Sequence, residues 1–569
     1  MSTATSSRSA PDASGAFTHR QILTILSGLM LGMFLAALDQ TVVSTAIRTI
    51  ADDLQGFELQ AWATTSFLIT STISTPLYGK LSDIYGRRPF YLAAITIFLI
   101  GSLLCGMADS MYQLAVFRAV QGIGAGGLMS LALAILGDIV PPRERSRYQG
   151  MFMAVFGTSS VVGPLVGGFF AGSESIFGID GWRWIFFINL PLGIAALVVV
   201  ARVLQLPHTR REHRIDWPGA IALVVTLVPV LTVAEQGRTW GWTSAEALAA
   251  YAIGTLGFVG FVLAERAYGD AALLPLRLFR NLTFRVSTIS SFIVGSGMFG
   301  ALVMLPLYLQ IVQGSTPTQA GLQTIPLMIG IIFAAMGSGI AISRTGRYKV
   351  FPVIGSLVMA LALLMFGFVG ADTPLWQVMA VMLVLGVGLG FNMQSMVLAA
   401  QNAVSPQEMG VATSSVTFFR QMGGTLGAAV FLSVLFSTLT ANISAATERV
   451  AGTAAYQQAL SANPGDAALL RTADLDDTSF IGALAPTLAE PFKVGFAESM
   501  NLIFLVAAGV LLLGFVVVSF LPEVPLRTMS GVQARAADAA AGTGAPEAME
   551  PASRERVAGE DRPGTDQRA

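Results

Sequence analysis

Long apolar stretches, separated by short polar ones, recur along the chain between residues 21 and 520. A helix needs about 20 mostly apolar residues to cross the hydrocarbon core of a bilayer, so each stretch of this length predicts a transmembrane helix. The first stretch is too long for the core of a signal peptide and is expected to remain as a span. Fourteen spans are predicted, at 21–47, 61–78, 90–108, 112–137, 149–171, 185–206, 217–236, 245–264, 284–312, 319–342, 350–370, 375–400, 411–438 and 497–520. The expected fold class is an all-α polytopic membrane protein.

The composition agrees with a membrane location and excludes other classes. Hydrophobic residues make up 54% of the 569 positions and charged residues 12%, against about 25% charged in soluble domains. There is no basic tract of the kind that binds nucleic acid, and no HExxH or GxSxG pattern of the kind that marks hydrolases. With one cysteine, Cys105, and three histidines in predicted cytoplasmic segments, the sequence predicts neither a disulfide framework nor a metal site.

Lysine and arginine are concentrated on one side of the predicted spans. With the N-terminus inside, 25 of the 33 lie in cytoplasmic segments, six lie outside, and Arg118 and Arg420 lie within spans. Positive residues favour the cytoplasmic side, and one missed span would invert every later loop. The asymmetry therefore supports the span count and predicts that both termini are cytoplasmic.

The chain repeats itself at an offset of 264 residues, which brings the glycines of "GIGAGG" (122–127) onto those of "GVGLGF" (386–391). Two six-helix halves of the same orientation follow, with two extra helices between them. Parallel repeats with a site at the midplane are typical of transporters. The predicted parts are a cytoplasmic tail at 1–20, a six-helix half at 21–206, two inserted helices and linkers at 207–282, a second half at 283–521 with an outer loop at 439–496, and a disordered cytoplasmic tail at 522–569.

Five segments carry a resemblance to a known family. They are "LDQTVVSTAI" (38–47), "GKLSDIYGRRPF" (79–90), "LAVFRAVQGIGAGG" (114–127), "GPLVGG" (163–168) and "GWRWIFFINLPLG" (181–193). From residue 20 to residue 520 the chain resembles the drug:proton antiporter-2 family of the major facilitator superfamily, the branch with fourteen helices. The "GPxxGG" element is the most informative, because in that superfamily it accompanies export by antiport.

The resemblance implies a major facilitator fold and a proton-coupled antiporter of the multidrug efflux type. Such a protein exports lipophilic or amphiphilic compounds, cationic ones included, by alternating access. The alternative, export of an endogenous lipid or secondary metabolite by the same mechanism, is not separated by the sequence. The expected partners are protons, small lipophilic substrates and the lipid bilayer, with the proton gradient as energy source and no cofactor. A monomer in the plasma (inner) membrane is expected. A bacterial origin is expected because 30 arginines against 3 lysines suggest a GC-rich genome.

The resemblance implies that the segment 79–90 forms a latch between the two halves. Gly79 and Gly86 allow two helices to approach and turn tightly, and Asp83 can accept hydrogen bonds at a neighbouring helix N-terminus. Arg87 and Arg88 hold the cytoplasmic face. The resemblance implies that the latch is closed in the outward-facing state. The alternative is a positively charged turn that serves topology alone.

The segment 163–168 is predicted to form a thin, bendable helix at the interface between the halves. Gly163 and Gly167 are spaced to permit close helix contact, and Pro164 removes one backbone hydrogen bond, which allows a kink. Gly168 is assigned to the same kink element. A general packing seam of small residues is the alternative.

Asp39 and Arg118 are predicted to couple transport to protons. An ionised aspartate at mid-helix depth costs roughly 2.5–3.5 kcal/mol, so its presence indicates a function. Counted from the helix ends at 1.5 Å per residue, the acid and the base both lie roughly 9–12 Å from the outer face. A carboxyl group binds a proton more tightly without water and less tightly beside a cation. Asp39 is expected to carry the proton and Arg118 to tune it; the alternative is a static buried ion pair.

Four further polar residues are predicted to line a substrate cavity. Arg420 lies near the middle of its span and could bind an anionic group, while Gln310, Asn392 and Gln394 lie on other spans of the second half. For each of them a packed contact between helices is the alternative.

Overall fold

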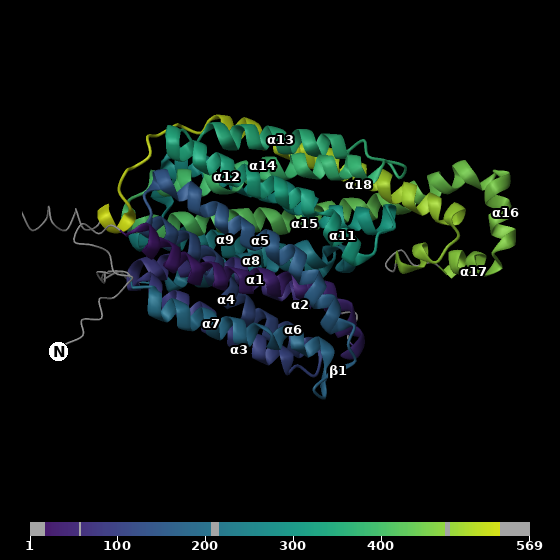
Figure 1. Ribbon diagram of the computed structural model, residues 1–569, viewed down its shortest axis with the longest axis horizontal. Helices are drawn as coiled ribbons and strands as arrows, with labels where there is room; N and C mark the ends of the chain where they lie inside the picture. Colours follow the sequence, from purple (N-terminus) through teal and green to yellow (C-terminus); the bar gives the residue numbers. More distant parts are fainter. Residues whose placement is uncertain (1–16, 56–58, 206–214, 473–477, 535–569) are drawn as a thin grey trace, which may run out of the picture.

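The computed structural model describes residues 17–55, 59–205, 215–472 and 478–534, which form an elongated bundle of helices (Figure 1). The longer helices are α1 (His19–Asp53), α2 (Gln60–Tyr85), α3 (Arg87–Gly106), α4 (Met111–Ile139), α5 (Pro142–Ala171), α7 (Asn189–Val203), α8 (Trp217–Trp240), α9 (Ala245–Tyr268), α10 (Leu282–Leu307), α12 (Ile325–Thr345), α13 (Val350–Phe366), α14 (Leu375–Ala403), α15 (Met409–Ala451) and α18 (Pro486–Ser519). The shorter elements are α6 (Trp184–Phe187), α11 (Pro317–Gln323), α16 (Ala454–Ala462), α17 (Pro464–Thr472) and the antiparallel pair β1 (Ser175–Ile176) and β2 (Ile179–Asp180).

Most of the longer helices have the length and apolarity of membrane spans. In the described ranges, 12 helical segments are long and apolar enough to cross a bilayer. The apolar helix α13 is shorter, at 17 residues, and α2, which is rich in serine and threonine, is not among the 12. The predicted all-α, membrane-spanning fold class is confirmed, whereas the number fourteen stays a prediction.

The helices fall into two halves with a helix pair beside them. α1 to α7 form the first half and α10 to α18 the second, and between the halves α2 packs on α15 and α5 packs on α12. The inserted helices α8 and α9 pack on each other, and α8 contacts both α2 and α15. The insertion therefore covers the seam between the halves along one side.

The repeated glycines pack in the same way in both halves. In 122–127, the first and third glycine face the backbone of α2, while Gly124 faces the backbone of α3. In 386–391, the first and third glycine face the backbone of α12, while Gly388 faces α13. At each position a Cβ atom would overlap the neighbouring helix, so the sequence repeat reflects a repeated close crossing of three helices.

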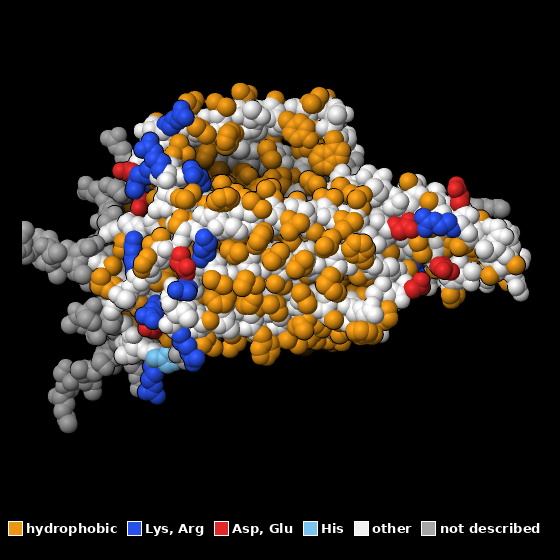
Figure 2. All heavy atoms as spheres, turned by 90° about the horizontal axis from the view of Figure 1, so that it is seen from above, with side chains coloured by type: hydrophobic (Ala, Val, Ile, Leu, Met, Phe, Trp, Pro, Cys, Tyr) orange, Lys and Arg blue, Asp and Glu red, His pale blue; other side chains and the backbone are white. Residues whose placement is uncertain are grey.

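Basic side chains gather at one end of the bundle, the left end in Figure 2, while hydrophobic side chains cover its flank. We call this end the basic end; it carries the start of α1 and the turn between α2 and α3. The opposite end carries α16 and α17, which project beyond the bundle (Figure 1). At Gly86 the backbone has φ 100°, a conformation that side chains rarely adopt, and this residue alone separates α2 from α3.

Two segments differ from their predictions. The expected outer loop at 439–496 is largely helical, because α15 continues to Ala451, α16 and α17 follow, and α18 begins at Pro486. The expected disordered tail at 522–569 is packed against the bundle through residue 534, with Ser530 and Val532 buried. Its remainder, like residues 1–16 of the predicted N-terminal tail, lies outside the described residues.

Candidate transport site and gate

Asp39 and Arg118 are in direct contact inside the first half. Arg118 Nη1 lies 2.5 Å from Asp39 Oδ2, and each residue is only 1% exposed. Arg118 also donates from Nε to the Ala63 carbonyl at 3.2 Å. Its Cζ lies 4.1 Å from the centre of the Phe67 ring, so the guanidinium is held from several directions. The acid and the base that the sequence placed at one depth are therefore joined between α1 and α4.

Two amide side chains complete the hydrogen bonding of the Asp39 carboxylate. Gln121 Nε2 and Asn189 Nδ2 both donate to Asp39 Oδ1, at 2.8 and 2.7 Å. Gln121 Oε1 accepts from Arg118 Nη1 at 2.8 Å, and Asn189 Nδ2 also donates to Ser102 Oγ at 2.9 Å. One carboxylate thus connects α1 with α4 and α7, and Asn189 extends the connection to α3. Charged and hydrogen-bonded donors of this kind offset the cost of burying the charge.

Sequence reasoning gave no role to Gln121 or Asn189. Gln121 follows Arg118 by three residues and therefore lies on the same face of α4, which is a signal that the sequence contains. Asn189 is part of the 181–193 motif, but no spacing indicates that it meets the first helix.

A cavity of about 470 Å³ lies between the halves, nearer the opposite end than the basic end. Thr41 and Thr45 of α1, Pro164 of α5 and Gln310 of the second half are in its lining. Asp39 is not, because two residues of helix place it on the opposite side of α1 from Thr41. The cavity has the size of small-molecule sites, about 300–1,000 Å³. Gln310 lines it, and contact with substrate stays a prediction.

The glycines of 163–168 face α1 in their own half rather than the second half. A Cβ atom on Gly163 would overlap Thr41 Oγ1, and one on Gly167 would lie 2.8 Å from the Val42 carbonyl oxygen. Gly168 faces open space, and its part in the kink element stays a prediction. Pro164 borders the cavity, and α5 continues without interruption through it.

Asp83 joins the two halves at the basic end. Its Oδ1 accepts from the Gly410 amide at 3.1 Å and its Oδ2 from the Val411 amide at 2.9 Å. These amides lie in the first turn of α15, where N–H groups have no partner within the helix and carry partial positive charge. Gly79 lies against Ser414 so closely that a Cβ atom would overlap the hydroxyl group. Asp83 and Gly79 thus connect the two halves at this end, and the latch function stays a prediction.

Arg87 supports this contact, but Arg88 does not take part in it. Arg87 Nη2 lies 2.5 Å from Asp83 Oδ1, and its Nε lies 2.8 Å from Asp138 Oδ2. Arg88 Nη2 instead donates to the Ala201 carbonyl at 2.6 Å, within the first half. The prediction of a latch role for Arg88 is therefore wrong. Asp138, which the sequence did not single out, holds Arg87 in place from α4.

Further hydrogen bonds cross between the halves at the basic end. Arg143 Nε donates to the Ser343 carbonyl at 2.8 Å, and Arg145 Nη1 donates to Gln401 Oε1 at 2.9 Å. Gln401 Nε2 donates in turn to the Leu133 carbonyl at 3.3 Å. The basic end is closed by several independent contacts, while the larger cavity lies toward the other end.

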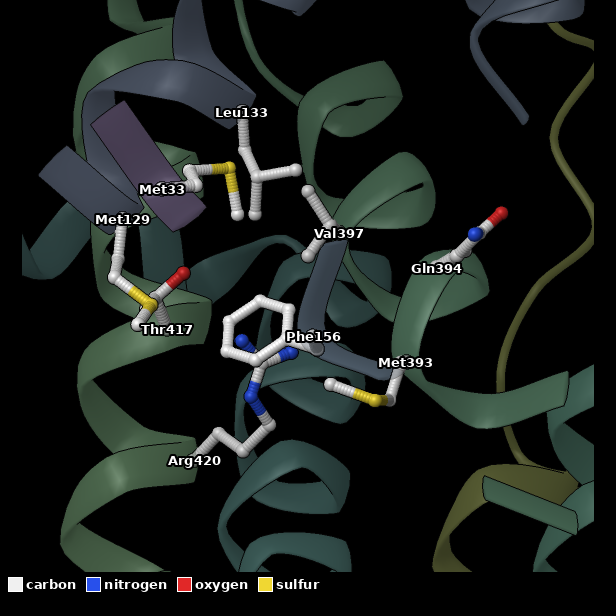
Figure 3. Close-up of a pocket in the computed structure, with 9 residues that line it drawn as sticks. All are labelled: Met33, Met129, Leu133, Phe156, Met393, Gln394, Val397, Thr417 and Arg420. Carbon is white, nitrogen blue, oxygen red and sulfur yellow. The ribbon is translucent and has the colours of Figure 1, made fainter. Parts of the chain in front are cut away.

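A second, smaller cavity of about 40 Å³ lies at the seam between the halves (Figure 3). Its lining is Met33, Met129, Leu133 and Phe156 from the first half, and Met393, Gln394, Val397, Thr417 and Arg420 from the second. In Figure 3 Arg420 and Met393 extend into this group, whereas the side chain of Gln394 extends away from Arg420. Gln394 is 3% exposed, and its amide atoms have no hydrogen-bond partner among the described residues.

Asn392 does not line either cavity. Its Oδ1 accepts from Ser356 Oγ at 3.1 Å and its Nδ2 donates to the Gly388 carbonyl at 3.1 Å, so it is packed between α13 and α14. The prediction of a cavity role for Asn392 is wrong. Across the described ranges, no group of three or more histidine, cysteine, aspartate or glutamate residues is placed to hold a metal ion.

Comparison with known proteins agrees with this architecture. The sequence model of the Major Facilitator Superfamily, a protein family, matches residues 29–428 of this chain. An uncharacterized MFS-type transporter of Mycobacterium tuberculosis (strain H37Rv) is 37% identical over 93% of this chain and 73% of its own length. Multidrug resistance protein 3 of Bacillus subtilis (strain 168) is 35% identical over 76% of this chain and 83% of its own. The solved structure of the proton:xylose symporter XylE has a TM-score of 0.55 at 16% identity, covering 91% of this chain and 100% of that one, a likeness of fold.

Proposed function

Because the chain belongs to the major facilitator superfamily, and is a multi-pass membrane transporter rather than an enzyme, we propose that it is a proton-coupled antiporter. It exports lipophilic or amphiphilic compounds from a bacterial cell across the plasma membrane by alternating access. The basic end faces the cytoplasm, as the positive-inside rule favours, so both termini are cytoplasmic. The observation that carries this proposal is the sealed Asp39–Arg118 pair on a helix whose other side borders the larger cavity.

The proton is carried by the Asp39 carboxylate. When Asp39 is neutral, its attraction to Arg118 falls, yet Arg118 keeps the Ala63 carbonyl and Gln121 Oε1 as acceptors. Protonation therefore loosens α1 from α4 without leaving the guanidinium free of partners. The hydrogen bonds from Gln121 and Asn189 also weaken, because a neutral carboxyl group is a poorer acceptor than a carboxylate.

The change at Asp39 reaches the substrate through α1 itself. Thr41, on the other side of this helix, donates to the Ser159 carbonyl of α5 at 3.1 Å and borders the larger cavity. A shift of α1 against α4 and α7 therefore alters the cavity wall and the α1–α5 contact together. Substrate and proton compete through the position of one helix, which is the requirement for antiport.

The latch sets the second condition for transport. In the present conformation Asp83 and the first turn of α15 close the basic end, as expected for a protein that faces outward. To take up substrate from the cytoplasm, the two halves rock and these hydrogen bonds break. The function is thus a cycle between this conformation and one in which the basic end is open.

Transport in proteoliposomes tests the proposal directly. Ethidium, a lipophilic cation, or 11-(dansylamino)undecanoic acid, an amphiphilic acid, is loaded, and a pH gradient is imposed in either direction. We expect net substrate movement opposite to the proton gradient, reversal of the flux when the gradient is reversed, and loss of the flux with an uncoupler. A flux of the same size and direction under both gradients would overturn proton antiport. Export of an endogenous lipid or secondary metabolite uses the same mechanism and differs only in the substrate.

A further inference from the structure

Arg420 is a cation at the seam between the halves, and no described residue is paired with it. It is half-buried in α15 and lines the 40 Å³ cavity between the halves. Across the part of the chain that the structure describes, no carboxylate lies within ion-pair distance of its guanidinium and no acceptor takes a hydrogen bond from it. Other arginines inside the bundle are paired, as Arg118 is with Asp39 and Arg87 with Asp138.

An unpaired guanidinium in this place is costly, and its cost needs a compensation. A charge removed from bulk water is stable only when an opposite charge or a set of acceptors replaces the water. A packing role would be served better by an apolar side chain, since the rest of the lining is mainly methionine, leucine, valine and phenylalanine. The missing acceptor therefore indicates a group that comes from outside the chain.

The backbone that carries Arg420 is held firmly by α10. Gly295 of α10 lies so close to the Arg420 carbonyl that a Cβ atom would overlap it, and Gly423 lies equally close to the Phe292 carbonyl. These contacts leave no room for α15 to slide along α10. The backbone of Arg420 is therefore held beside α10, and its side chain extends from there into the cavity (Figure 3).

The surroundings define the chemistry of the ligand. Met33 and Phe156 contribute apolar surface from the first half and Met393 from the second. The polar groups of the lining are the Arg420 guanidinium, the Thr417 hydroxyl and the Gln394 amide, which extends away from Arg420 (Figure 3). Methionine side chains adapt to ligands of different shape. A guanidinium binds a carboxylate or a similar acidic group by two parallel hydrogen bonds. The lining thus fits an amphiphile with one acidic head group and an apolar body.

The two cavities lie along the same pair of helices. Phe156 at the small cavity and Ser160 at the large one are separated by one turn of α5, about 5–6 Å. Met33 and Thr41 are separated in the same way by eight residues of α1, roughly 12 Å. A head group at Arg420 and an apolar body in the 470 Å³ cavity are therefore compatible with one elongated molecule.

We propose that Arg420 is the anion-binding subsite of the substrate pathway, and that the transported compounds include amphiphiles carrying a single acidic group. This inference rests on the proposed transport function for its biological meaning, but the binding itself needs no proton gradient. The acid group lies between the halves against Arg420, and its apolar body extends toward the opposite end.

Equilibrium binding to protein in nanodiscs tests this subsite. The probes are 11-(dansylamino)undecanoic acid and its methyl ester, with binding to empty nanodiscs subtracted. For the wild type we expect tighter binding of the acid than of the ester. Arg420→Met should lose this preference, with acid affinity reduced about tenfold as expected for one charge-assisted contact, while Arg420→Lys keeps part of it. Arg347→Met, which removes an exposed arginine of the same half outside this lining, should keep the preference.

Thermal unfolding of the same variants separates binding from a structural role. If Arg420 only joined helices, Arg420→Met would lower the unfolding temperature; as a ligand-binding cation without a protein partner, it should leave the temperature unchanged or raise it. Equal binding of acid and ester by the wild type, or an unchanged acid preference in Arg420→Met, would overturn the subsite. Since no gradient is applied, loss of proton coupling in Asp39→Asn would leave this result intact and would count against the transport mechanism alone.

Discussion

Three side chains contact the two carboxylate oxygens of Asp39 within the bundle. Arg118 supplies the opposite charge at 2.5 Å, while Gln121 and Asn189 donate to the other oxygen. Buried ion pairs gain little over apolar residues, but removal of one member leaves the other charge unpaired. The stability of this site therefore depends on whether Asp39 is ionised or neutral beside Arg118. A proton carrier requires such a dependence.

Removal of Arg118 should be more harmful than removal of the whole pair. We expect Arg118→Met to lower the free energy of unfolding by about 3–5 kcal/mol, because Asp39 is left buried without its cation. The double variant Asp39→Asn with Arg118→Met should recover part of this loss. Thermal unfolding of the purified proteins in detergent measures both. Equal stability of the single and the double variant would contradict a strong charge coupling at this site.

For single residues, the sequence predicted the pairing of Asp39 with Arg118 but not the side chains around the pair. The depth of Asp39 and Arg118 follows from helical rise alone, so their meeting could be expected. Asn189 reaches the same carboxylate from a helix 150 residues further on, and helical spacing carries no information about such a contact. Asn392 was expected to face a cavity but packs against α13. A polar residue on an apolar helix does not reveal which of these two surroundings it has.

Helices in this bundle approach most closely where glycine replaces a side chain. α1 and α5 meet at Gly163 and Gly167, α2 and α15 meet at Gly79, and α10 and α15 meet at Gly295. At such a glycine the backbone atoms of two helices are in van der Waals contact, and a single added methyl group would separate them. The contacts between the helices are therefore defined by small residues as much as by charges.

Two glycines of α5 test the α1–α5 contact, because Gly163 lies in the contact and Gly168 lies outside it. Gly163→Ala places a methyl group against Thr41, so we expect a loss of about 1–3 kcal/mol in stability together with slower substrate transport. Gly168→Ala, five residues on in the same helix, meets open space and should change neither. Thermal unfolding and transport in proteoliposomes measure the two effects. The same response from both variants would show that the contact is not specific.

Asp83 should control how often the basic end opens. Asp83→Asn removes the charge that faces the first turn of α15, so we expect the open conformation to gain population. Pro89 and Val350 are both exposed and lie in different halves. Spin labels at these two positions, in a Cys105→Ala background, report the distance between the halves by double electron–electron resonance spectroscopy. A shift toward longer distances is expected.

Glu144 provides the control for this measurement. It is an exposed acid at the same end, and Glu144→Gln should leave the distance distribution as in the wild type. An unchanged distribution in Asp83→Asn would contradict a latch function and would favour a role in topology alone.

Element boundaries outside the bilayer were the least predictable part of the fold. Hydropathy detects the apolar part of a helix, so the last span but one was expected to end at 438, whereas α15 continues to Ala451. Residues beyond the apolar part are helical but polar, with Arg449 paired to Glu498 of α18 at 2.6 Å. A window of hydrophobicity cannot separate such a helix from a loop.

At the scale of the whole molecule, the C-terminal segment 521–534 joins the two halves at the basic end (Figure 1). Tyr348 donates to the Pro522 carbonyl at 3.0 Å, and burial raises the pKa of this phenol, which keeps it protonated as the donor. Further along, Arg527 donates its amide to Asn402 Oδ1 at 3.2 Å, in the second half. Gly531 then lies beside Asp138, at the end of α4 in the first half.

Removal of this segment should weaken closure of the basic end. A chain ending at Leu521 loses its contacts to Asn402 and Asp138, so we expect more of the open conformation and a lower unfolding temperature. A chain ending at Ala534 retains every contact described here and serves as the control. The distance between labels at Pro89 and Val350 measures both chains. Identical distributions for the two truncations would exclude a role for the segment in closure.

The repeat of the sequence predicted two halves of one orientation, but not how they stand to each other. Glycines at equivalent positions impose equivalent helix crossings within each half, as 122–127 and 386–391 show. The relation between the halves depends on contacts such as Arg145 with Gln401, which join residues far apart in the chain. A transporter must break these contacts in each cycle, and local sequence patterns do not record them.

The central claim is that Asp39 carries the transported proton, and substrate-stimulated proton release from proteoliposomes under a set pH gradient tests it most directly. We expect the wild type to release protons in step with substrate movement. Asp39→Asn, which cannot ionise, should bind substrate but release none in response to it. Equal substrate-stimulated release by both proteins would contradict the claim, leaving the helical fold and the closed latch in place without a role for this carboxylate in coupling.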